Sequence, residues 1–469
     1  MLENVLKFSI EHRYLILMGI VLIAAIGIFS LQRLPIDAVP DITPNQVQVN
    51  TDFPGLSPVE IEKQITFPLE NALAGIPGLT YTRSLSRNGF SQIVATFRDD
   101  VSVYFARQQV NERLAEARKN LPPGVDPKMG AITTGLGEVY VWAVSYKYPD
   151  GNVVKINDGA PGWQSDGSYL TPEGERLVTD LQQTAYLRTV EDWIIRPQLK
   201  GLEGLADVDA IGGYVKKYHI QPDPMKLFSF GLTFQDLIEA VKRNNTSVGA
   251  GYIEYQGEAY VVRSDGRIQD EAQIADIVVD TRSGMPIHVH DVATVEIGKE
   301  LRTGSASLNS KEAVIGTAWM LIGANSRTVA AAVSEKLGQI NQTLPPDIRA
   351  IPLLSRTKLV DATIAPVRGN LAEGSILVIV VLFVLLGNIR AAIITALAIP
   401  LSMLMAFTGM VQLNISGNLM SLGAIDFGLI VDGAVIIVEN CLRRLGEKQH
   451  DLGRGTVPSR ASPRSHGSQ

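Results

Sequence analysis

The sequence has a single cysteine, Cys441, and no block of lysine and arginine that is long enough to bind nucleic acid. One cysteine excludes an intrachain disulfide and a zinc site built from several thiolates. The formal net charge of −6 also excludes the basic surface that DNA-binding and RNA-binding proteins require. Charged residues make up only 19% of the chain and hydrophobic residues 46%. These proportions indicate a mixed protein, with one part in a lipid bilayer and another in water.

Uncharged segments long enough to cross a bilayer lie near both ends of the chain. Residues 14–32 form the first, and residues 374–389 and 391–425 form two more that Arg390 separates. A helix of about 20 apolar residues spans the hydrocarbon core, so the last segment is long enough for two helices. A cleaved signal peptide is the alternative for the first segment, but no A-x-A cleavage site follows it. We predict four spans, at residues 14–33, 371–389, 391–413 and 418–441.

Basic residues flank the predicted spans on one side of the membrane. Lys7 and Arg13 precede the first span, Arg390 separates the second from the third, and Arg443 follows the fourth. By the positive-inside rule that side is the cytoplasm. We therefore expect a multi-pass protein of the inner (plasma) membrane whose residues 34 to about 367 are periplasmic.

The long segment between the first two spans has the pattern of a soluble α/β region. Residues 45–53 alternate like a strand, and Ser57-Pro58-Val59-Glu60 combines a capping box with proline at the first helical position. The strands and helices predicted between residues 45 and 123 have the order β-α-β-β-α-β, which is the split βαβ pattern of ferredoxin-like domains. The pattern recurs from residue 135, and a separate block at about 215–296 interrupts it. We expect an α+β membrane protein with two copies of one soluble module.

Three carboxylates lie within the fourth predicted span, at Asp426, Asp432 and Glu439. An ionisable side chain at membrane depth costs about 2.5 to 3.5 kcal/mol, so such residues usually have a function. Asp432 and Glu439 share one helical face, and Gly428 and Gly433 would let a neighbouring helix cover it. A carboxylate on such a buried face can bind and release protons near neutral pH. The pattern favours a proton relay; packing against basic residues of neighbouring helices is the alternative.

Two further groups of side chains could bind metal. His288 and His290 are two apart, so in a strand both would lie on one face; an exposed strand beside a turn is the alternative. Met403, Met405 and Met410 in the third predicted span could be soft ligands, but methionines at such positions usually fill a core. We favour the non-metal interpretation for both groups.

The acidic fourth span carries a resemblance to a known family. Its motifs Asp426-Phe427-Gly428, Asp432-Gly433-Ala434 and Glu439-Asn440 are similar to the heavy-metal signature of resistance-nodulation-division efflux pumps. Drug-exporting relatives usually have two adjacent aspartates where this chain has Asp432-Gly433, and the copper/silver branch usually lacks an acid at the position of Asp426. The resemblance, which covers residues 1 to about 453, therefore indicates the cobalt-zinc-cadmium branch.

The resemblance implies a transporter and not an enzyme. It implies the permease subunit of a tripartite pump that exports zinc, cobalt or cadmium at the expense of the proton motive force, without a cofactor. Such permeases are homotrimers that work with a periplasmic adaptor (membrane fusion protein) and an outer-membrane channel. Asp426, Asp432 and Glu439 would relay protons, and Glu138 resembles an acid of the periplasmic metal cleft. A plain surface carboxylate is the alternative for Glu138.

The resemblance also assigns the parts of the chain. The family's second half, with eight further spans and much of the metal site, is absent, so we expect an N-terminal fragment that is inactive alone. A fragment that associates with an intact pump without transporting, or a relative that exports another class of substrate, is the alternative. We interpret residues 442–469 as a polar cytoplasmic tail typical of a truncated or frame-shifted reading frame. The other assignments are residues 1–33 to an N-terminal helix and first span, 34–130 to the first porter subdomain, 131–214 with 297–355 to the second, 215–296 to a docking subdomain, 356–390 to a connector and second span, and 391–413 and 418–441 to the third and fourth spans.

Overall fold

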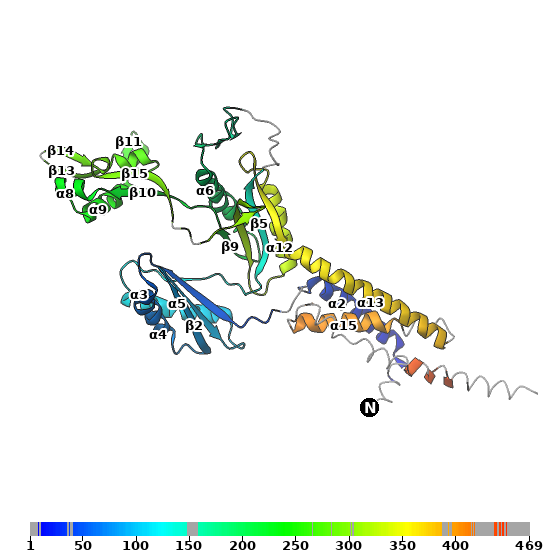
Figure 1. Cartoon of the computed structure of the whole chain (residues 1–469). Helices are drawn as coiled ribbons and strands as arrows, with labels where there is room; N and C mark the ends of the chain where they lie inside the picture. Colours follow the sequence, from blue (N-terminus) through cyan, green and yellow to red (C-terminus); the bar gives the residue numbers. More distant parts are fainter. Residues whose placement is uncertain are drawn as a thin grey trace, which may run out of the picture.

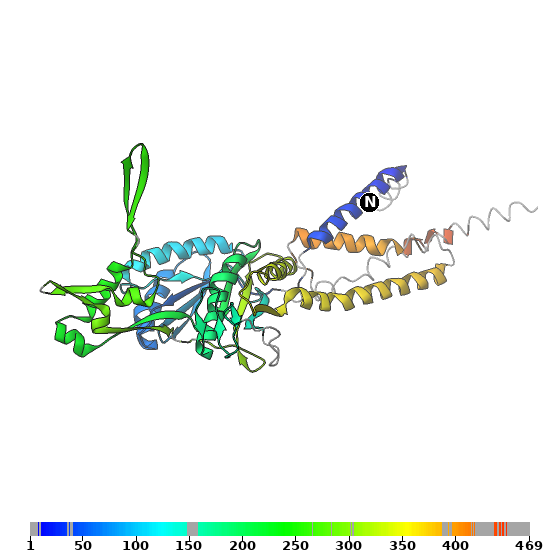
Figure 2. The same cartoon turned by 90° about the horizontal axis from the view of Figure 1, so that it is seen from above.

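The computed structural model describes residues 11–34, 41–147, 158–386 (apart from 265, 283, 301 and 303) and 396–413, together with residues 8, 37, 393, 415, 417, 436–438, 440, 441, 443, 444 and 447. The sheets and their covering helices form one part of the molecule. The long helices α2 (Arg13–Arg33), α13 (Arg356–Leu386) and α15 (Ala398–Gln412) project away from the sheets on one side (Figures 1 and 2).

The first α/β module has the predicted order of elements. Its antiparallel sheet has the strand order β2-β3-β1-β4, which is the order of a split βαβ fold. Ser57 and Glu60 form the predicted capping box, with the Ser57 side chain and the Glu60 backbone N–H bonded to each other. Apolar side chains from the sheet and from both helices form one buried core. The elements are β1 (Gln46–Asp52), α3 (Pro58–Ile61), η1 (Glu62–Thr66), α4 (Phe67–Leu73), β2 (Leu79–Arg87), β3 (Phe90–Phe97), α5 (Val103–Ala117), η2 (Arg118–Asn120) and β4 (Lys128–Met129).

The second module repeats this topology with strands that are far apart in the sequence. Its sheet has the order β19-β5-β18-β9, so the first and last strands are neighbours as in the first module. Thr179 and Gln182 form a capping box where the first helix begins. The elements are β5 (Glu138–Tyr146), α6 (Asp180–Val190), η3 (Glu191–Ile195), α7 (Arg196–Leu199), β9 (Leu205–Ile211), β18 (Val314–Met320), α12 (Ser326–Ile340) and β19 (Ile348–Ser355).

Each module contains a π-helical turn that our helix prediction missed. In the first, the Phe67 N–H donates to the Glu62 carbonyl, and in the second the Arg196 N–H donates to the Glu191 carbonyl. A proline follows one residue later in each case, at Pro68 and at Pro197. A proline ring inside a regular helix collides with the carbonyl four residues earlier, and the wider turn relieves that collision. Both helices therefore continue past a residue that would otherwise end them.

Two insertions interrupt the second module. The shorter one is a three-stranded sheet of β6 (Gly162–Trp163), β7 (Tyr169–Leu170) and β8 (Arg176–Leu177). The longer one, which we call the inserted block, leaves and returns through paired strands β10 (Lys216–Pro222) and β15 (Ala293–Lys299). Its other elements are α8 (Pro224–Phe230), α9 (Phe234–Asn244), β11 (Val248–Tyr255), β12 (Glu258–Ser264), α10 (Glu271–Ala275), β13 (Val278–Arg282), β14 (Met285–His288) and α11 (Val289–Val292). It has a small core of its own, separate from that of the second module.

The helical part agrees only partly with the four predicted spans. Within the described ranges, α2 alone passes a test of length and apolarity for crossing a membrane. It packs closely on α15, because a Cβ at Gly27 would meet Leu404 and because Phe407 and Met410 are buried beside the end of α2. Met410 thus fills a core and Met403 packs against it, as we favoured, whereas Met405 is 62% exposed. Residues 356–370, which we expected to be a connector, are helical, since α13 begins directly after β19 and runs for 31 residues.

The close approach of Gly316 to Trp142 in the second sheet predicts how a substitution at Gly316 changes stability. Gly316 lies opposite Trp142, and a Cβ at Gly316 would overlap the indole ring of that fully buried tryptophan. Gly316→Ala should therefore lower the free energy of unfolding by about 1–3 kcal/mol. Gly338→Ala in α12 is the matched control, because no heavy atom lies within 4 Å of the added Cβ; it should raise stability by about 0.5–1 kcal/mol. Denaturant unfolding of the detergent-solubilised chain, followed by tryptophan fluorescence, measures both; equal stability of Gly316→Ala and wild type would contradict the prediction.

Candidate functional site

The structure describes one of the four predicted site residues. Asp426, Asp432 and Glu439 lie outside the described residues. Glu138 is the first residue of β5 and is half-buried. Strand β5 starts at the end of the sheet where β18 and β19 finish, and this end adjoins the start of α13. Glu138 therefore lies at the end of the second module from which the long helices project.

The neighbours of Glu138 across the sheet are a tryptophan and a second acid. Trp319 lies opposite Glu138 on one side and opposite Asp207 on the other. The pairing of β18 is irregular at Trp319 on both sides. In register, one acid lies in the strand on each side of this tryptophan. The Lys200 ammonium lies 3.0 Å from the Asp207 carboxylate. Among the residues that the structure describes, none forms a hydrogen bond or ion pair with the Glu138 carboxylate, which leaves its oxygens available to a ligand.

The row of acids does not amount to a complete metal site. In the described part of the chain, no three side chains from His, Cys, Asp and Glu are grouped so that they could hold one ion. Glu138 supplies hard oxygen atoms of the kind that divalent cations bind, but further ligands would have to come from elsewhere. On its own this arrangement can attract a cation and provide one ligand to it.

The predicted histidine pair is arranged differently from our expectation. His288 ends β14, but His290 lies in the helical turn α11, because the Asp291 carboxylate accepts a hydrogen bond from the His288 N–H and caps the turn. The two rings are stacked with centroids 5.1 Å apart and planes 12° apart. One nitrogen of each ring is engaged with the backbone: His288 Nδ1 lies 2.8 Å from the Asp276 carbonyl and His290 Nδ1 lies 2.9 Å from the Ala275 carbonyl. Within the described residues, no third ligand is grouped with the pair. The metal-binding interpretation, with both residues on one strand face, was wrong; a strand that ends at His288 beside a turn is the alternative that we favoured.

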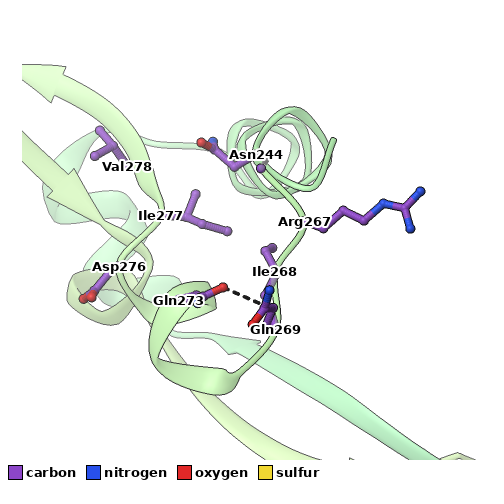
Figure 3. A pocket seen from close by; sticks show the side chains of 9 residues that line it. Asn244, Arg267, Ile268, Gln269, Gln273, Asp276, Ile277 and Val278 are labelled. Atoms are coloured by element: carbon purple, nitrogen blue, oxygen red, sulfur yellow. Dashed lines mark hydrogen bonds between the residues drawn. The ribbon is translucent and has the colours of Figure 1, made fainter. Parts of the chain in front are cut away.

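A pocket of about 430 Å³ lies in the inserted block, where the β11–β12 hairpin joins it (Figure 3). Asn244 and Gln273 line it, the Gln269 N–H donates to the Gln273 side chain at 2.9 Å, and Arg267 points away from it (Figure 3). Asp276 is its single carboxylate. Amide groups dominate this lining, so the pocket has neither the charge nor the ligand set of a metal site.

Glu191 is a buried acid that our sequence reasoning missed. Its side chain is fully buried, and its Oε2 accepts a 2.9 Å hydrogen bond from the Trp142 indole N–H. Burial, together with the nearby Asp192 charge, raises the pKa of Glu191 to about 7, although the Trp142 hydrogen bond and the arginines Arg188 and Arg196 lower it. A signal was present in the sequence: Leu187, Glu191 and Ile195 are four apart, which sets the acid on the apolar face of its helix.

Comparison with known proteins places the whole chain in one family. Residues 5–462 match the AcrB/AcrD/AcrF family. The chain is 56% identical over 454 residues to the nickel-cobalt-cadmium resistance protein NccA of Alcaligenes xylosoxydans xylosoxydans, covering 97% of this chain and 42% of that protein. It is 51% identical over 466 residues to the cobalt-zinc-cadmium resistance protein CzcA of Cupriavidus metallidurans. This match covers 99% of this chain and 41% of that protein. A crystal structure of a heavy metal efflux pump aligns with TM-score 0.77 at 32% identity, over 94% of this chain and 41% of that one. The chain thus spans less than half the length of these relatives.

The raised pKa of Glu191 predicts how stability depends on pH. The folded pKa of about 7 exceeds the ordinary value of 4.5, so the folded state binds this proton more tightly. The contribution of Glu191 to stability should therefore be greatest below pH 4.5 and should fall by about 3 kcal/mol as pH rises to 7. Glu191→Gln keeps an oxygen acceptor for Trp142 but does not titrate, so this loss should disappear.

Denaturation of both proteins in detergent between pH 5 and pH 8 measures the effect. Glu203→Gln serves as the control, because Glu203 is exposed and should leave the pH dependence unchanged. Parallel stability curves for wild type and Glu191→Gln would show that Glu191 is ionised throughout this range.

Proposed function

The chain belongs to the AcrB/AcrD/AcrF family, and we propose that it is part of a proton-driven permease that exports divalent heavy-metal cations. The observation that carries this proposal is the 56% and 51% identity, over nearly the whole chain, to proteins named for nickel-cobalt-cadmium and cobalt-zinc-cadmium resistance. Identity to the cation efflux protein CusA of Escherichia coli is lower, at 32%. Cobalt, zinc, cadmium and nickel are therefore the proposed cargo.

The proposed membrane arrangement is the inner-membrane one with spans at residues 14–33, 371–389, 391–413 and 418–441. The length and apolarity of α2 support the first span, and the projection of α13 and α15 on the same side as α2 supports the next two (Figure 1). The sheets would then lie in the periplasm. This orientation agrees with the basic residues that flank the spans.

The proposed energy source is a proton relay through Asp426, Asp432 and Glu439. Their position in an otherwise apolar segment supports this role, because carboxylates at membrane depth are retained mainly for proton or ion transfer. Glu138 is the proposed periplasmic metal contact. Support comes from its place at the sheet end nearest the long helices and from its carboxylate, which no described side chain pairs.

The proposed assembly is a homotrimer with a periplasmic adaptor and an outer-membrane channel. The β11–β12 hairpin supports contact with another chain, because it projects from the inserted block (Figure 2). Its side chains Tyr252, Ile253 and Val261 are 72%, 60% and 79% exposed. An isolated two-stranded hairpin with apolar side chains is marginal in water, so packing against a second copy would stabilise it.

Metal uptake by everted membrane vesicles tests the proposed function. The permease that contains this chain should accumulate cobalt, zinc or cadmium when a pH gradient is imposed and should not accumulate a cationic dye. Asp432→Asn preserves size and hydrogen bonding but cannot titrate, so uptake should fall to the background at unchanged expression. Asp100→Asn, in an exposed pair with Arg98, is the control and should transport normally. Uptake of dye but no metal, or full activity of Asp432→Asn, would refute the proposal.

A further inference from the structure

Asp37 makes polar contacts with segments from three parts of the chain. Its Oδ1 accepts a hydrogen bond from the Ser326 hydroxyl at 3.0 Å and lies 3.1 Å from the Arg356 Nε. Its backbone N–H donates to the Gly417 carbonyl at 3.0 Å. We call Asp37, Ser326 and Arg356 the Asp37 clasp. It joins the segment after α2 to the first residues of α12 and of α13, and the segment after α15 adjoins it.

The clasp is shielded from water. The Arg356 side chain is 10% exposed and that of Asp37 is 20% exposed. A hydrogen-bonded ion pair at this depth is costly to break, because separating the partners leaves a charge that is neither paired nor well hydrated. Charge-assisted bonds of this kind are also directional, so they fix the orientation of the groups that carry them. The clasp is therefore suited to hold α13 at one angle to α12.

A second, more exposed set of contacts supports the same joint. Arg327 lies 2.9 Å from the Asp361 carboxylate, with side chains 48% and 52% exposed. The Thr357 hydroxyl donates to the Arg327 carbonyl at 3.1 Å. Exposed ion pairs contribute little to stability, so this set reinforces the joint without fixing it. Both sets connect the first turn of α12 with the first turns of α13.

The joint adjoins the sheet end that carries Glu138. Strand β19 ends at Ser355 and α13 begins at the next residue, so the chain passes from sheet to helix without a loop. Ser355 is paired with Tyr140 of β5, two residues from Glu138. The Tyr140 hydroxyl in turn bonds to Ser334 of α12 at 3.2 Å. An unbroken path of backbone pairing and hydrogen bonds therefore connects α13 with the start of β5.

We propose that Asp37, Ser326 and Arg356 are positioning residues that transmit displacement of the long helices to the sheet end bearing Glu138. With the clasp closed, α12 and α13 move as one body, so a shift of α13 displaces β19 and the start of β5. With the clasp open, α13 pivots at Ser355, so a shift of α13 leaves β19 and the start of β5 in place. The role in transport rests on the proposed function; the rigid joint itself does not.

The joint is tested on the whole chain in lipid nanodiscs by electron paramagnetic resonance distance measurement. Spin labels go on Glu335→Cys in α12 and Ile376→Cys in α13, both exposed, in a Cys441→Ser background. The unmodified clasp should give one narrow distance peak. Asp37→Asn, which removes the charge at constant size, should abolish the narrow peak, and Ser326→Ala should widen it less. Asp100→Asn is the control and should leave it narrow.

Ser326→Ala keeps the test decisive if Asp37→Asn does not fold, because it removes only one hydroxyl group. A distance peak as narrow as that of wild type in every folded clasp variant would overturn the proposal. In the permease that contains this chain, Asp37→Asn should lower the maximal rate of cobalt uptake about tenfold at unchanged KM. A variant that is only destabilised would instead lose transport and protein together. If the wild-type permease transports no metal, the proposed function is wrong. The distance measurement still shows whether the clasp holds α12 and α13 at one angle.

Discussion

The direct passage from β19 into α13 is the constraint on which the rest of the structure depends. A strand that pairs with β5 cannot move independently of it, and a helix that starts at the next residue cannot tilt without bending that junction. The ion pair of Asp37 and Arg356, which is largely shielded from water, links this junction to the segment after α2. The second α/β module and α13 thus meet without an intervening loop. This connection lies at the same end of the sheet as Glu138, the acid proposed to meet the metal.

The interior of the second module combines dense packing with one buried acid. Trp142 occupies the space above Gly316 and donates its N–H to Glu191, so a large apolar side chain also satisfies a buried carboxylate. A carboxylate without a full set of donors favours its protonated form, which explains the direction of its pKa. The π-helical turn that begins at Glu191 is also the turn that accommodates Pro197. Packing, backbone geometry and ionisation are therefore coupled at this one helix.

Local patterns in the sequence predicted local structure well. The alternation at residues 45–53 and the capping motif at Ser57 correspond to β1 and to the start of α3, because both depend on neighbouring residues only. The pair of Asp37 and Arg356 could not be predicted, since 319 positions separate its members and no periodicity connects them. The strand-face arrangement of His288 and His290, which we did not favour, fails because the Asp291 carboxylate caps a helical turn directly after His288. The proposed relay acids remain predictions from the sequence.

The central claim is that the sheet end bearing Glu138 receives the metal ion in the periplasm. The most direct measurement is the KM for cobalt uptake in vesicles containing the permease with Glu138→Gln, compared with Glu335→Gln as an exposed control on α12. Loss of one oxygen ligand should raise KM about tenfold or more while the maximal rate stays the same. A KM equal to that of wild type would show that Glu138 is an ordinary surface carboxylate and would contradict the claim.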